Sequence, residues 1–433
     1  MGMRLFAERR RRLLERITGT AVFSSPPITY RNGDVENEFR QDSDLYYLTG
    51  LAEPDSVLVL SASHPTLKQV LFMRPRDPDS EVWDGPRAGI EDAVARFGVD
   101  AAYSIRELKE KLPDLLKGSS RLYYRIGRDR RFDERVLEAI GRVRGRGRTP
   151  HLWPSEIVEP AGVLHEMRAI KDADEIQKMS RAAEVTRDAH LWAMSVTKPG
   201  MFEFEIEARV REVFRKNGSE RPAYLPIVGS GPNATVLHYR ANKRKVGEGD
   251  LVLLDAGCEL DYYASDVTRT FPASGVFSDA QRRIYDIVLD AQLTAIEAVK
   301  PGATLEEVHA AAVRVIAGGL LGLGLLEGSL EKILEDQAHR PFYMHRTSHW
   351  LGMDVHDVGA YFIEGKPRPL EPGMVLTVEP GIYIRADNDK VPSEYRGIGV
   401  RIEDDILVTE TGHRDLTADI PKQAGDVERA CRA

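Results

Sequence analysis

One stretch of the chain, residues 251–271, is typical of two short strands folded back on each other, because Val, Leu, Thr and Tyr dominate it. A two-residue turn at Leu260 and Asp261 would place Asp255 directly opposite Asp266. Opposed side chains in an antiparallel pair lie roughly 4.5–5.5 Å apart at Cβ, and two like charges there are destabilising. A fold keeps such a pair if one carboxyl is protonated or a cation lies between them. The hairpin alone leaves open the alternative that both carboxylates are simply exposed.

The length of the chain predicts more than one domain. Its 433 residues exceed the limit of about 250–300 residues for a single core. We expect an N-terminal domain over residues 1–170 and a catalytic domain over residues 171–433. A composition of 42% hydrophobic and 30% charged residues is that of a globular protein. The net charge of −8 argues against nucleic-acid binding as the main role.

The cysteine content and the hydropathy predict a cytoplasmic protein. Cys258 and Cys431 are too few for a disulfide framework, which favours a reducing compartment. No run of eighteen apolar residues exists, so we expect no membrane partner. The basic N-terminus, residues 4–17, is followed by no apolar segment of the kind found in export signals, and it fits an amphipathic helix.

The first domain mixes strands and helices. Residues 57–60 and 70–73 are apolar runs of strand length, and residues 91–97 and 106–116 fit short helices. The basic, glycine-rich segment 141–150 has no apolar period and predicts an exposed loop near a domain boundary. These alternating elements predict an α/β domain, and no catalytic constellation stands out within it.

The second domain contains an internal duplication. In each half, two helices separated by Lys-Pro-Gly precede a histidine and then a strand that ends in an acid. Asp255 and Glu379 each stand six residues after a glycine at the start of that strand. The expected helices are residues 172–195 and 203–216 in the first half, and 278–300 and 304–320 in the second. Such a duplication brings Glu379 towards Asp255 and Asp266.

Four carboxylates and one imidazole make up the candidate site: Asp255, Asp266, His349, Glu379 and Glu403. In a final strand over residues 399–408, alternation puts Arg401 on the same face as Glu403. Oxygen-rich sites with few imidazoles suit Mn²⁺ and related divalent ions. Four acids are too many for one small ion, whereas two ions about 3.5–4 Å apart can share them. Such a pair favours hydrolysis of an amide or ester.

Five segments carry a family resemblance: Asp255-Ala-Gly, residues 265–271, residues 348–359, Val378-Glu-Pro-Gly-Ile-Tyr383 and Arg401-Ile-Glu403. They resemble the pita-bread metallopeptidases, and most of all the aminopeptidase P group, the Xaa-Pro aminopeptidases. The match covers residues 172–420 and extends weakly into the first domain through residues 40–44 and 83–89. The resemblance implies an α/β N-terminal domain that frames the site. It also implies an α+β pita-bread (creatinase/aminopeptidase) catalytic domain with a pseudo-twofold duplicated antiparallel sheet.

The resemblance implies a ligand set for two divalent ions, of which Mn²⁺ fits best, with Co²⁺ or Zn²⁺ as alternatives. Asp255 and Asp266 would hold one ion, and Asp266, His349, Glu379 and Glu403 the other. Asp266 and Glu403 would bridge the two. Glu379 would also accept a proton from the bridging water and pass it to the leaving nitrogen.

Further residues are implied in catalysis by the same resemblance. His238 and His356 would bind substrate and stabilise the oxyanion, and Arg401 would neutralise and orient the ligand carboxylates. The residues that bind substrate would be His345, Trp83 and Tyr383. In related enzymes a tryptophan at the position of Trp83 reaches the rim of the active site, sometimes from a neighbouring subunit. A homo-oligomer, dimer or tetramer, is therefore expected.

The activity implied is hydrolysis of the bond between an N-terminal residue and a following proline. That bond has no N–H, so it needs a pocket that accepts the ring. The alternative closest in chemistry is prolidase, the Xaa-Pro dipeptidase. A metal-free pita-bread binding protein or a creatinase-like hydrolase is a further alternative, but those lose several of the ligands found here. Arg346 departs from the family pattern, which has a small residue after the first histidine of this motif.

Overall fold

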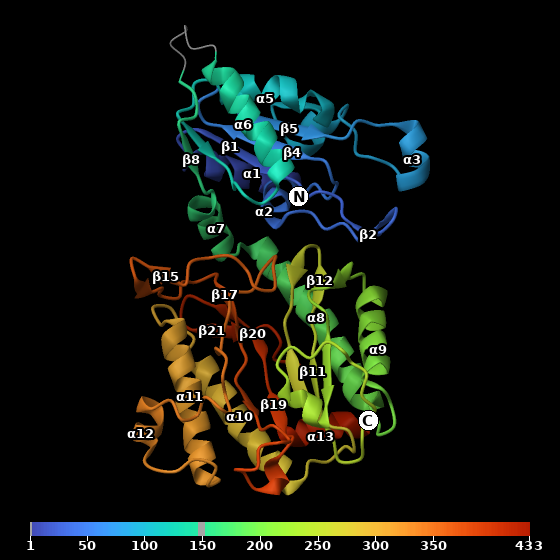
Figure 1. The fold of residues 1–433 in the computed structure, drawn as a ribbon, viewed down its shortest axis with the longest axis vertical. Coiled ribbons are helices and arrows are strands. Elements are labelled where there is room, and N and C mark those ends of the chain that lie inside the picture. The colour runs from blue at the N-terminus through green and yellow to red at the C-terminus, as the bar shows by residue number, and fades with distance from the viewer. Residues whose placement is uncertain (1, 146–151) are drawn as a thin grey trace. The chain divides into compact units, whose positions relative to one another are not determined.

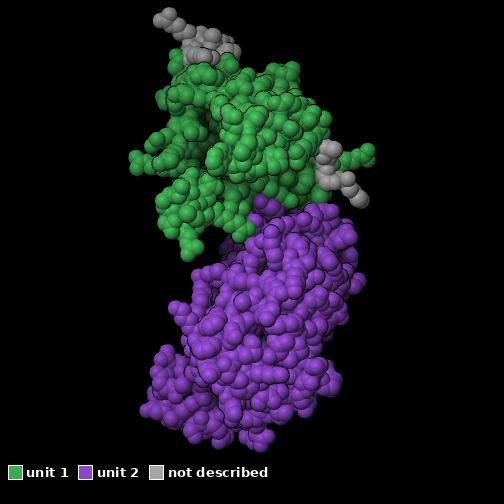
Figure 2. All heavy atoms as spheres, turned by 90° about the vertical axis from the view of Figure 1, so that its right-hand side faces the viewer, with its two compact units in different colours: residues 1–166 green, residues 167–433 purple. Residues whose placement is uncertain are grey.

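The computed structural model describes residues 2–145 and 152–433. The chain divides into two compact units, Met1–Glu166 and Met167–Ala433, which Figure 2 colours separately. From the sequence we expected the boundary between residues 170 and 171. In the structure this region is the helix α7 (Ala161–Ala169), which contains the end of one unit and the start of the next.

A six-stranded mixed sheet forms the centre of the first unit, in the order β6-β5-β4-β1-β7-β8 (Figure 1). Strands β1, β4 and β5 pair antiparallel, whereas β6, β7 and β8 each add in parallel. Their bounds are β1 Thr20–Ser24, β4 Val57–Ser61, β5 Gln69–Met73, β6 Ala101–Ser104, β7 Arg121–Tyr123 and β8 Glu156–Val158. A separate hairpin consists of β2 (Tyr30–Asn32) and β3 (Val35–Glu36).

Helices α5 (Leu108–Leu116) and α6 (Arg130–Arg144) supply the leucines, Phe132 and Val136 that pack on this sheet. The other helices are α1 (Gly2–Leu14), α2 (Ser43–Thr49), α3 (Pro78–Asp84) and α4 (Ala93–Phe97), with the short 3₁₀ helix η1 (Ile105–Glu107) before α5. The exposed loop expected from residue 141 is wrong for residues 141–144, which complete α6, since the apolar period of that helix continues to the buried Val143. The rest of that segment, from residue 146, lies outside the described residues.

The second unit repeats one arrangement. Helices α8 (Ala173–Val196) and α9 (Glu203–Lys216) contact β12 and β10, α10 (Asp279–Glu297) contacts β17, and α11 (Leu305–Gly322) packs on α10 (Figure 1). Reciprocal capping boxes begin three of these helices: Asp172 with Glu175, Ser278 with Gln281, and Thr304 with Glu307. The sequence predicts the boxes at Ser278 and Thr304, and at Asp172 it predicts a helix cap without its partner. One apolar core joins all four helices to the strands between them.

The strands of the second unit form short antiparallel sheets in the orders β10-β11-β14, β13-β12-β9, β17-β20-β21, β18-β19 and β15-β16. Those of the first half are β9 Arg221–Pro222, β10 Ile227–Ser230, β11 Leu251–Asp255, β12 Cys258–Leu260, β13 Tyr263–Ala264 and β14 Thr268–Pro272. Those of the second half are β15 Phe362–Ile363, β16 Lys366–Pro367, β17 Val375–Val378, β18 Gly381–Tyr383, β19 Gly399–Arg401, β20 Asp404–Val408 and β21 His413–Asp415. The remaining helices are η2 (Gly231–Thr235), α12 (Leu330–Glu335), η3 (Ser393–Tyr395) and α13 (Ala424–Arg432).

The hairpin register differs from the expectation. Asp261 and Tyr262, with φ of 51° and 69°, occupy the turn, so Asp255 stands opposite Thr268 and not Asp266. The turn therefore lies one residue later than predicted. A two-residue hairpin turn in which both residues have positive φ is favoured because its twist matches that of the flanking strands. Thr268 lies two residues from Asp266, and side chains two residues apart in a strand point to the same face of a sheet. Asp266 therefore still points to the same face as Asp255.

The expected strand over residues 399–408 is also wrong, because it is broken at Ile402 and Glu403 into β19 and β20. Strand β19 pairs with β18, and β20 pairs with β17. The amide of Glu403 donates instead to the carbonyl of Thr268, at 3.1 Å. None of the helices in the described ranges combines the length and the apolar character that crossing a bilayer requires.

Gly257 allows the two sides of the hairpin to approach each other closely. A Cβ at this position would lie 1.7 Å from the carbonyl oxygen of Ser265. We expect Gly257→Ala to lower the free energy of unfolding by about 1–3 kcal/mol, because backbone must move to admit the methyl group. Since Gly257 lies between Asp255 and Asp266, the variant is also expected to bind less metal, measured by plasma mass spectrometry.

The matched control is Gly318→Ala within α11, where a Cβ would meet nothing within 4 Å. This variant is expected to raise the free energy of unfolding by about 0.5–1 kcal/mol, as alanine does in a helix interior. Denaturant unfolding of both variants makes the comparison. Equal stability of the Gly257→Ala variant and the wild type would contradict the close approach seen here.

Candidate active site

A cavity of about 860 Å³ opens within the second unit and is lined by side chains from both of its halves. Nine of the catalytic, metal-binding and substrate-binding residues expected from the sequence line it: His238, Asp255, Asp266, His345, His349, His356, Glu379, Arg401 and Glu403. Tyr383 is buried next to this group and contacts two of its members. Trp83 belongs to the first unit, on α3, and is 87% exposed.

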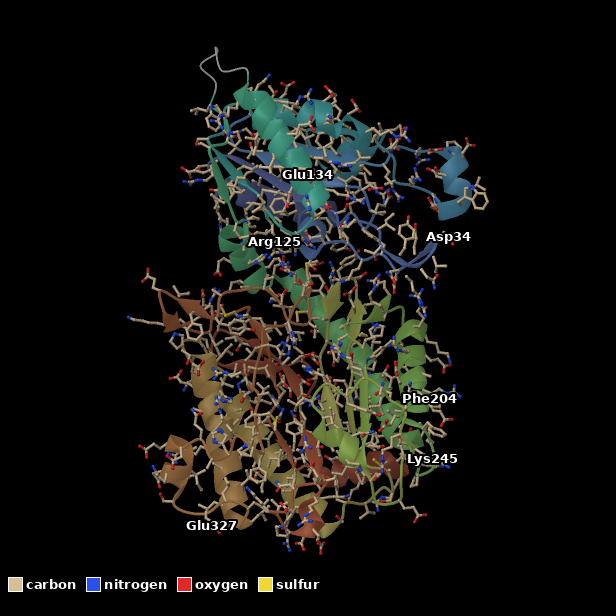
Figure 3. The ribbon with its side chains drawn as sticks, in the orientation of Figure 1. Asp34, Arg125, Glu134, Phe204, Lys245 and Glu327 are labelled. Atoms are coloured by element: carbon tan, nitrogen blue, oxygen red, sulfur yellow. The ribbon has the colours of Figure 1, made fainter. Side chains whose placement is uncertain are left out.

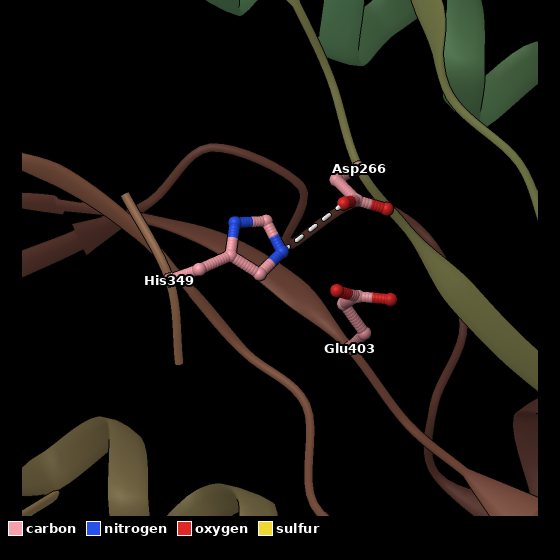
Figure 4. A group of neighbouring side chains, drawn as sticks. All are labelled: Asp266, His349 and Glu403. Carbon is pink, nitrogen blue, oxygen red and sulfur yellow. Dashed lines mark ion pairs between the residues drawn. The ribbon is translucent and has the colours of Figure 1, made fainter. Parts of the chain in front are cut away.

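Three side chains form the centre of the site, namely Asp266, His349 and Glu403 (Figure 4). Each offers one ligand atom, and these atoms all lie within 4.8 Å of one another. The Nε2 atom of His349 is 3.4 Å from Oδ2 of Asp266. Its Nδ1 donates a hydrogen bond to the carbonyl of Trp350, at 3.0 Å, so Nε2 is the ring nitrogen that faces the acids and could bind a metal ion once it has lost its proton. An imidazole fixed in this way fits a metal ligand.

Backbone pairing brings His349 next to Glu379. The carbonyl of His349 accepts from the amide of Thr377, at 3.0 Å, and the amide of Glu379 donates to the carbonyl of Thr347, at 2.8 Å. Because Glu379 directly follows β17, its side chain projects from the strand end towards the imidazole. The distance from Glu379 Oε1 to His349 Nε2 is 3.7 Å.

Arg401 connects Asp255 to the rest of the site. Its guanidinium donates to Oδ2 of Asp255 at 2.5 Å, to Oγ1 of Thr268 at 2.9 Å and to the hydroxyl of Tyr383 at 3.0 Å. Thr268 in turn donates to Glu403 at 2.6 Å. The arginine therefore neutralises one carboxylate directly and orients a second one through a hydroxyl group.

Burial and mutual repulsion leave these acids poorly suited to carry charge without a cation. Burial raises the pKa of Asp255 above its ordinary value, although Arg401 opposes the shift. Burial and the charge of Asp266 raise the pKa of Glu403 well above its usual range. Burial raises the pKa of Glu379 to about 7, against the opposing effect of His349 and Arg401. Divalent cations placed among these oxygens would relieve all three, so the donor set fits a metal centre.

The imidazoles differ in their electrostatic surroundings. Burial lowers the pKa of His349, but its hydrogen bond with Asp266 and the charge of Glu379 outweigh burial and bring the value to about 9. Burial and Arg401 lower the pKa of His345 to about 3. His345 shares a hydrogen bond of 2.8 Å with the hydroxyl of Tyr383 and lies 3.7 Å from Glu379. The ring of His356 lies edge-on to that of His349, with centroids 4.4 Å apart, and His238 is exposed on the pocket wall.

Two residues at the site escaped the sequence analysis. The hydroxyl of Tyr224 lies 2.5 Å from Oδ1 of both Asp255 and Asp266. The buried carboxylate of Asp405 accepts from the hydroxyl of Ser265, at 2.8 Å, and from the amide of Asp266, at 3.2 Å. No motif marks either residue, because their partners lie 31 to 140 positions away in the chain.

Two neighbouring acids, Asp357 and Asp404, form ion pairs instead of joining Asp266, His349 and Glu403. Asp357 binds Arg168 at 2.6 Å and Lys171 at 3.0 Å. Asp404 binds Arg269 at 2.6 Å and Lys422 at 2.8 Å. Each of these acids is buried with its partners and has a structural role.

Comparisons with known proteins agree with this geometry. The family model described as metallopeptidase family M24 matches residues 177–410, and the one described as the N-terminal domain of aminopeptidase P matches residues 6–123. A Xaa-Pro aminopeptidase from Escherichia coli is 44% identical over 427 residues, which are 98% of this chain and 96% of the relative.

Solved structures show the same fold. The aminopeptidase PepP of Pseudomonas aeruginosa is 46% identical and superimposes with a TM-score of 0.97, covering 99% of this chain and 98% of its own. A Zn-substituted E. coli aminopeptidase P in complex with product is 44% identical, with a TM-score of 0.96, covering 100% of this chain and 98% of its own. The predicted fold class, an α/β N-terminal domain followed by a pita-bread catalytic domain, is confirmed.

Proposed function

Because this chain belongs to metallopeptidase family M24, we propose that it is a Xaa-Pro aminopeptidase, which removes the N-terminal residue from peptides with proline in second position. The observation that carries the proposal is the cavity in which all five expected metal ligands meet. Two of them, Asp255 and Asp266, come from the first half of the catalytic unit. His349, Glu379 and Glu403 come from the second half.

The metal centre proposed here consists of two divalent ions, with Mn²⁺ as the best fit. Asp255 and Asp266 would hold one ion, and Asp266, His349, Glu379 and Glu403 the other. When bound, the ions supply hydroxide at neutral pH and polarise the substrate carbonyl. Arg401 and Tyr224 would fix the Asp255 carboxylate in its place, and Asp405 would fix Asp266 by holding its amide.

The side chains that line the pocket would transfer the proton and bind the substrate. Glu379, with a pKa raised to about 7, is suited to accept a proton from water and deliver it to the leaving proline nitrogen. His345 is neutral near pH 7 because its pKa is about 3, so it adds no charge to the pocket. Its ring nitrogens bond the carbonyl of Arg346 and the hydroxyl of Tyr383, both at 2.8 Å, which fixes the orientation of the imidazole. His238 and His356 stand on the pocket wall, where they could bind the substrate and its developing oxyanion.

The lining of the pocket suits an imide substrate. Leu225, Ile227, Leu237 and Phe362 supply apolar surface around the polar centre. A proline nitrogen has no N–H, so recognition of that ring depends on shape and apolar contact. This lining supports the choice of proline at the second position.

The test is a series of peptides of increasing length, Ala-Pro, Ala-Pro-Ala and Ala-Pro-Ala-Ala, assayed with Mn²⁺. An aminopeptidase is expected to cleave the two longer peptides, and chelation by EDTA is expected to reduce their turnover by at least about 10²-fold until Mn²⁺ is restored. Turnover of Ala-Pro alone would favour prolidase instead. Purified protein without metal and without chelator-sensitive hydrolysis would favour a binding protein.

Assembly and location complete the proposal. Trp83 and its neighbour Val82 are 87% and 80% exposed on α3, a helix that buries none of its residues within the chain. Such exposed apolar side chains support a homo-oligomer, dimer or tetramer, in which Trp83 reaches the rim of an active site. The two free cysteines favour a cytoplasmic location. Light scattering during size-exclusion chromatography tests the assembly.

A further inference from the structure

Three arginines line the active-site cavity, and their surroundings differ. Arg401 is buried against Asp255, and Arg346 forms an ion pair with Glu306 on the cavity wall. Arg240 is exposed and, among the residues that the structure describes, contributes to no hydrogen bond or ion pair. The cavity therefore has one guanidinium whose donors are available to a ligand.

The backbone that carries Arg240 is fixed on both sides. The hydroxyl of Tyr239 donates to the buried Glu203 at 2.8 Å. The buried Asn242 accepts from the amide of Val228 at 3.1 Å and donates to the carbonyl of Pro226 at 2.9 Å. Because these hydrogen bonds turn Tyr239 towards Glu203, the cavity is lined by His238 and Arg240 and not by Tyr239. Arg240 thus projects from a rigid segment, which lowers the entropy cost of binding a ligand there.

We propose that Arg240 determines substrate specificity by binding a carboxylate on the part of the peptide that follows the proline. This inference rests on the proposed Xaa-Pro aminopeptidase activity. A guanidinium matches a carboxylate with two parallel hydrogen bonds. It repels an ammonium group, so the N-terminal end of the substrate is directed away from Arg240 and towards the acids of the metal site.

Two sources present the same carboxylate chemistry at this position. One is the C-terminal carboxylate of a short peptide, and the other is the side chain of an aspartate or glutamate that follows the proline. Both place a negative charge beyond the scissile bond. The amides of Ala-Pro-Ala, Ala-Pro-Asn and Ala-Pro-Asp, together with the free acid Ala-Pro-Ala, separate the two sources.

The experiment measures kcat/KM of the Mn²⁺-loaded wild type and of Arg240→Gln on these four peptides. The wild type is expected to favour at least one carboxylate-bearing peptide over its neutral counterpart by about fivefold at low ionic strength. In Arg240→Gln the ratio is expected to fall to about one, whereas Arg240→Lys retains part of it. The preference of the wild type should also weaken in about 0.5 M salt, since exposed charges are screened.

Lys245→Gln is the matched control, because it removes one positive charge from the same segment. Figure 3 shows Lys245 at the outer edge of the catalytic unit, and it is not part of the cavity lining. This variant is expected to keep the wild-type preference. If Lys245→Gln lost the preference as fully as Arg240→Gln, general charge and not Arg240 would be responsible, and the inference would be overturned.

A binding measurement separates this inference from the proposed function. Calorimetric titration of Pro-Ala and of its amide into the Mn²⁺-loaded protein needs no turnover, and the free acid is expected to bind about fivefold more tightly. Loss of this difference in Arg240→Gln supports the inference. Equal binding of the two ligands by the wild type overturns it. Failure of the wild type to cleave any of the four peptides would instead reject the aminopeptidase activity.

Discussion

Replacement of Glu379 by glutamine is expected to lower kcat by about 10³-fold, within the range that removal of a general base produces. The amide has nearly the shape of the carboxylate but cannot accept a proton from water. It also removes one of the two carboxylates near His349, at 3.7 Å, and leaves that of Asp266 at 3.4 Å. Steady-state kinetics on Ala-Pro-Ala with saturating Mn²⁺ make the measurement.

Metal content and stability distinguish a lost proton acceptor from a lost metal ligand. If Glu379→Gln retains full Mn²⁺ occupancy and the wild-type unfolding midpoint, the fall in kcat reports proton transfer. Loss of one ion would show that coordination is the larger contribution of this side chain. A variant with wild-type kcat would exclude Glu379 from both roles.

The second large effect is expected at Asp404, which carries no catalytic role. Its carboxylate is fully buried against Arg269, whose side chain is also fully buried. It further accepts from Gln292 at 2.6 Å and from Thr417 at 2.7 Å. We expect Asp404→Asn to lower the free energy of unfolding by about 3–5 kcal/mol, because it leaves the guanidinium buried without a counter-charge. Denaturant unfolding is the measurement.

The pH dependence of this effect has a defined sign. Burial alone would raise the pKa of Asp404, but Arg269 and Lys422 lower it below its ordinary value. A depressed folded-state pKa gives stability that is present above the unfolded pKa, near 3.9, and is lost as the pH falls through the folded value. The difference between the wild type and Asp404→Asn should therefore shrink in acid.

The control for Asp404 is Asp286→Asn. Asp286 pairs with Arg282 at 2.8 Å within one exposed face of α10, and both side chains are 46% exposed. Surface pairs of this kind contribute about 0–1 kcal/mol, so the variant should unfold almost as the wild type does. A comparable loss in both variants would show that burial is not the cause of the Asp404 effect.

Local signals in the sequence predicted the elements whose causes are themselves local. The capping boxes at Ser278 and Thr304 and the helix cap at Asp172 were predicted correctly, because each depends on residues at most three positions apart. The acids Asp255 and Glu379 could be related through the duplicated pattern around them. The hairpin turn was misplaced by one residue, since neither Leu260 nor Asp261 signals which pair takes a positive φ.

Contacts between distant segments could not be predicted in the same way. Tyr224 reaches Asp255 and Asp266 only after the chain has folded. The break at Glu403 follows from a hydrogen bond to Thr268, and the residues around the break alternate as those of an unbroken strand would. Arg240 is one basic residue in a basic stretch, and what distinguishes it is its place in the cavity and the absence of a partner within residues 2–145 and 152–433.

The division of the proposed metal ligands between the two halves has a mechanical consequence. Asp255 and Asp266 belong to the first half, whereas His349, Glu379 and Glu403 belong to the second. An ion held by residues of both halves would link segments that lie far apart in the chain, and links that close long loops have the largest effect on the entropy of the unfolded ensemble. Binding to the native state alone also stabilises that state by mass action. Metal release and separation of the halves would then be two aspects of one opening motion.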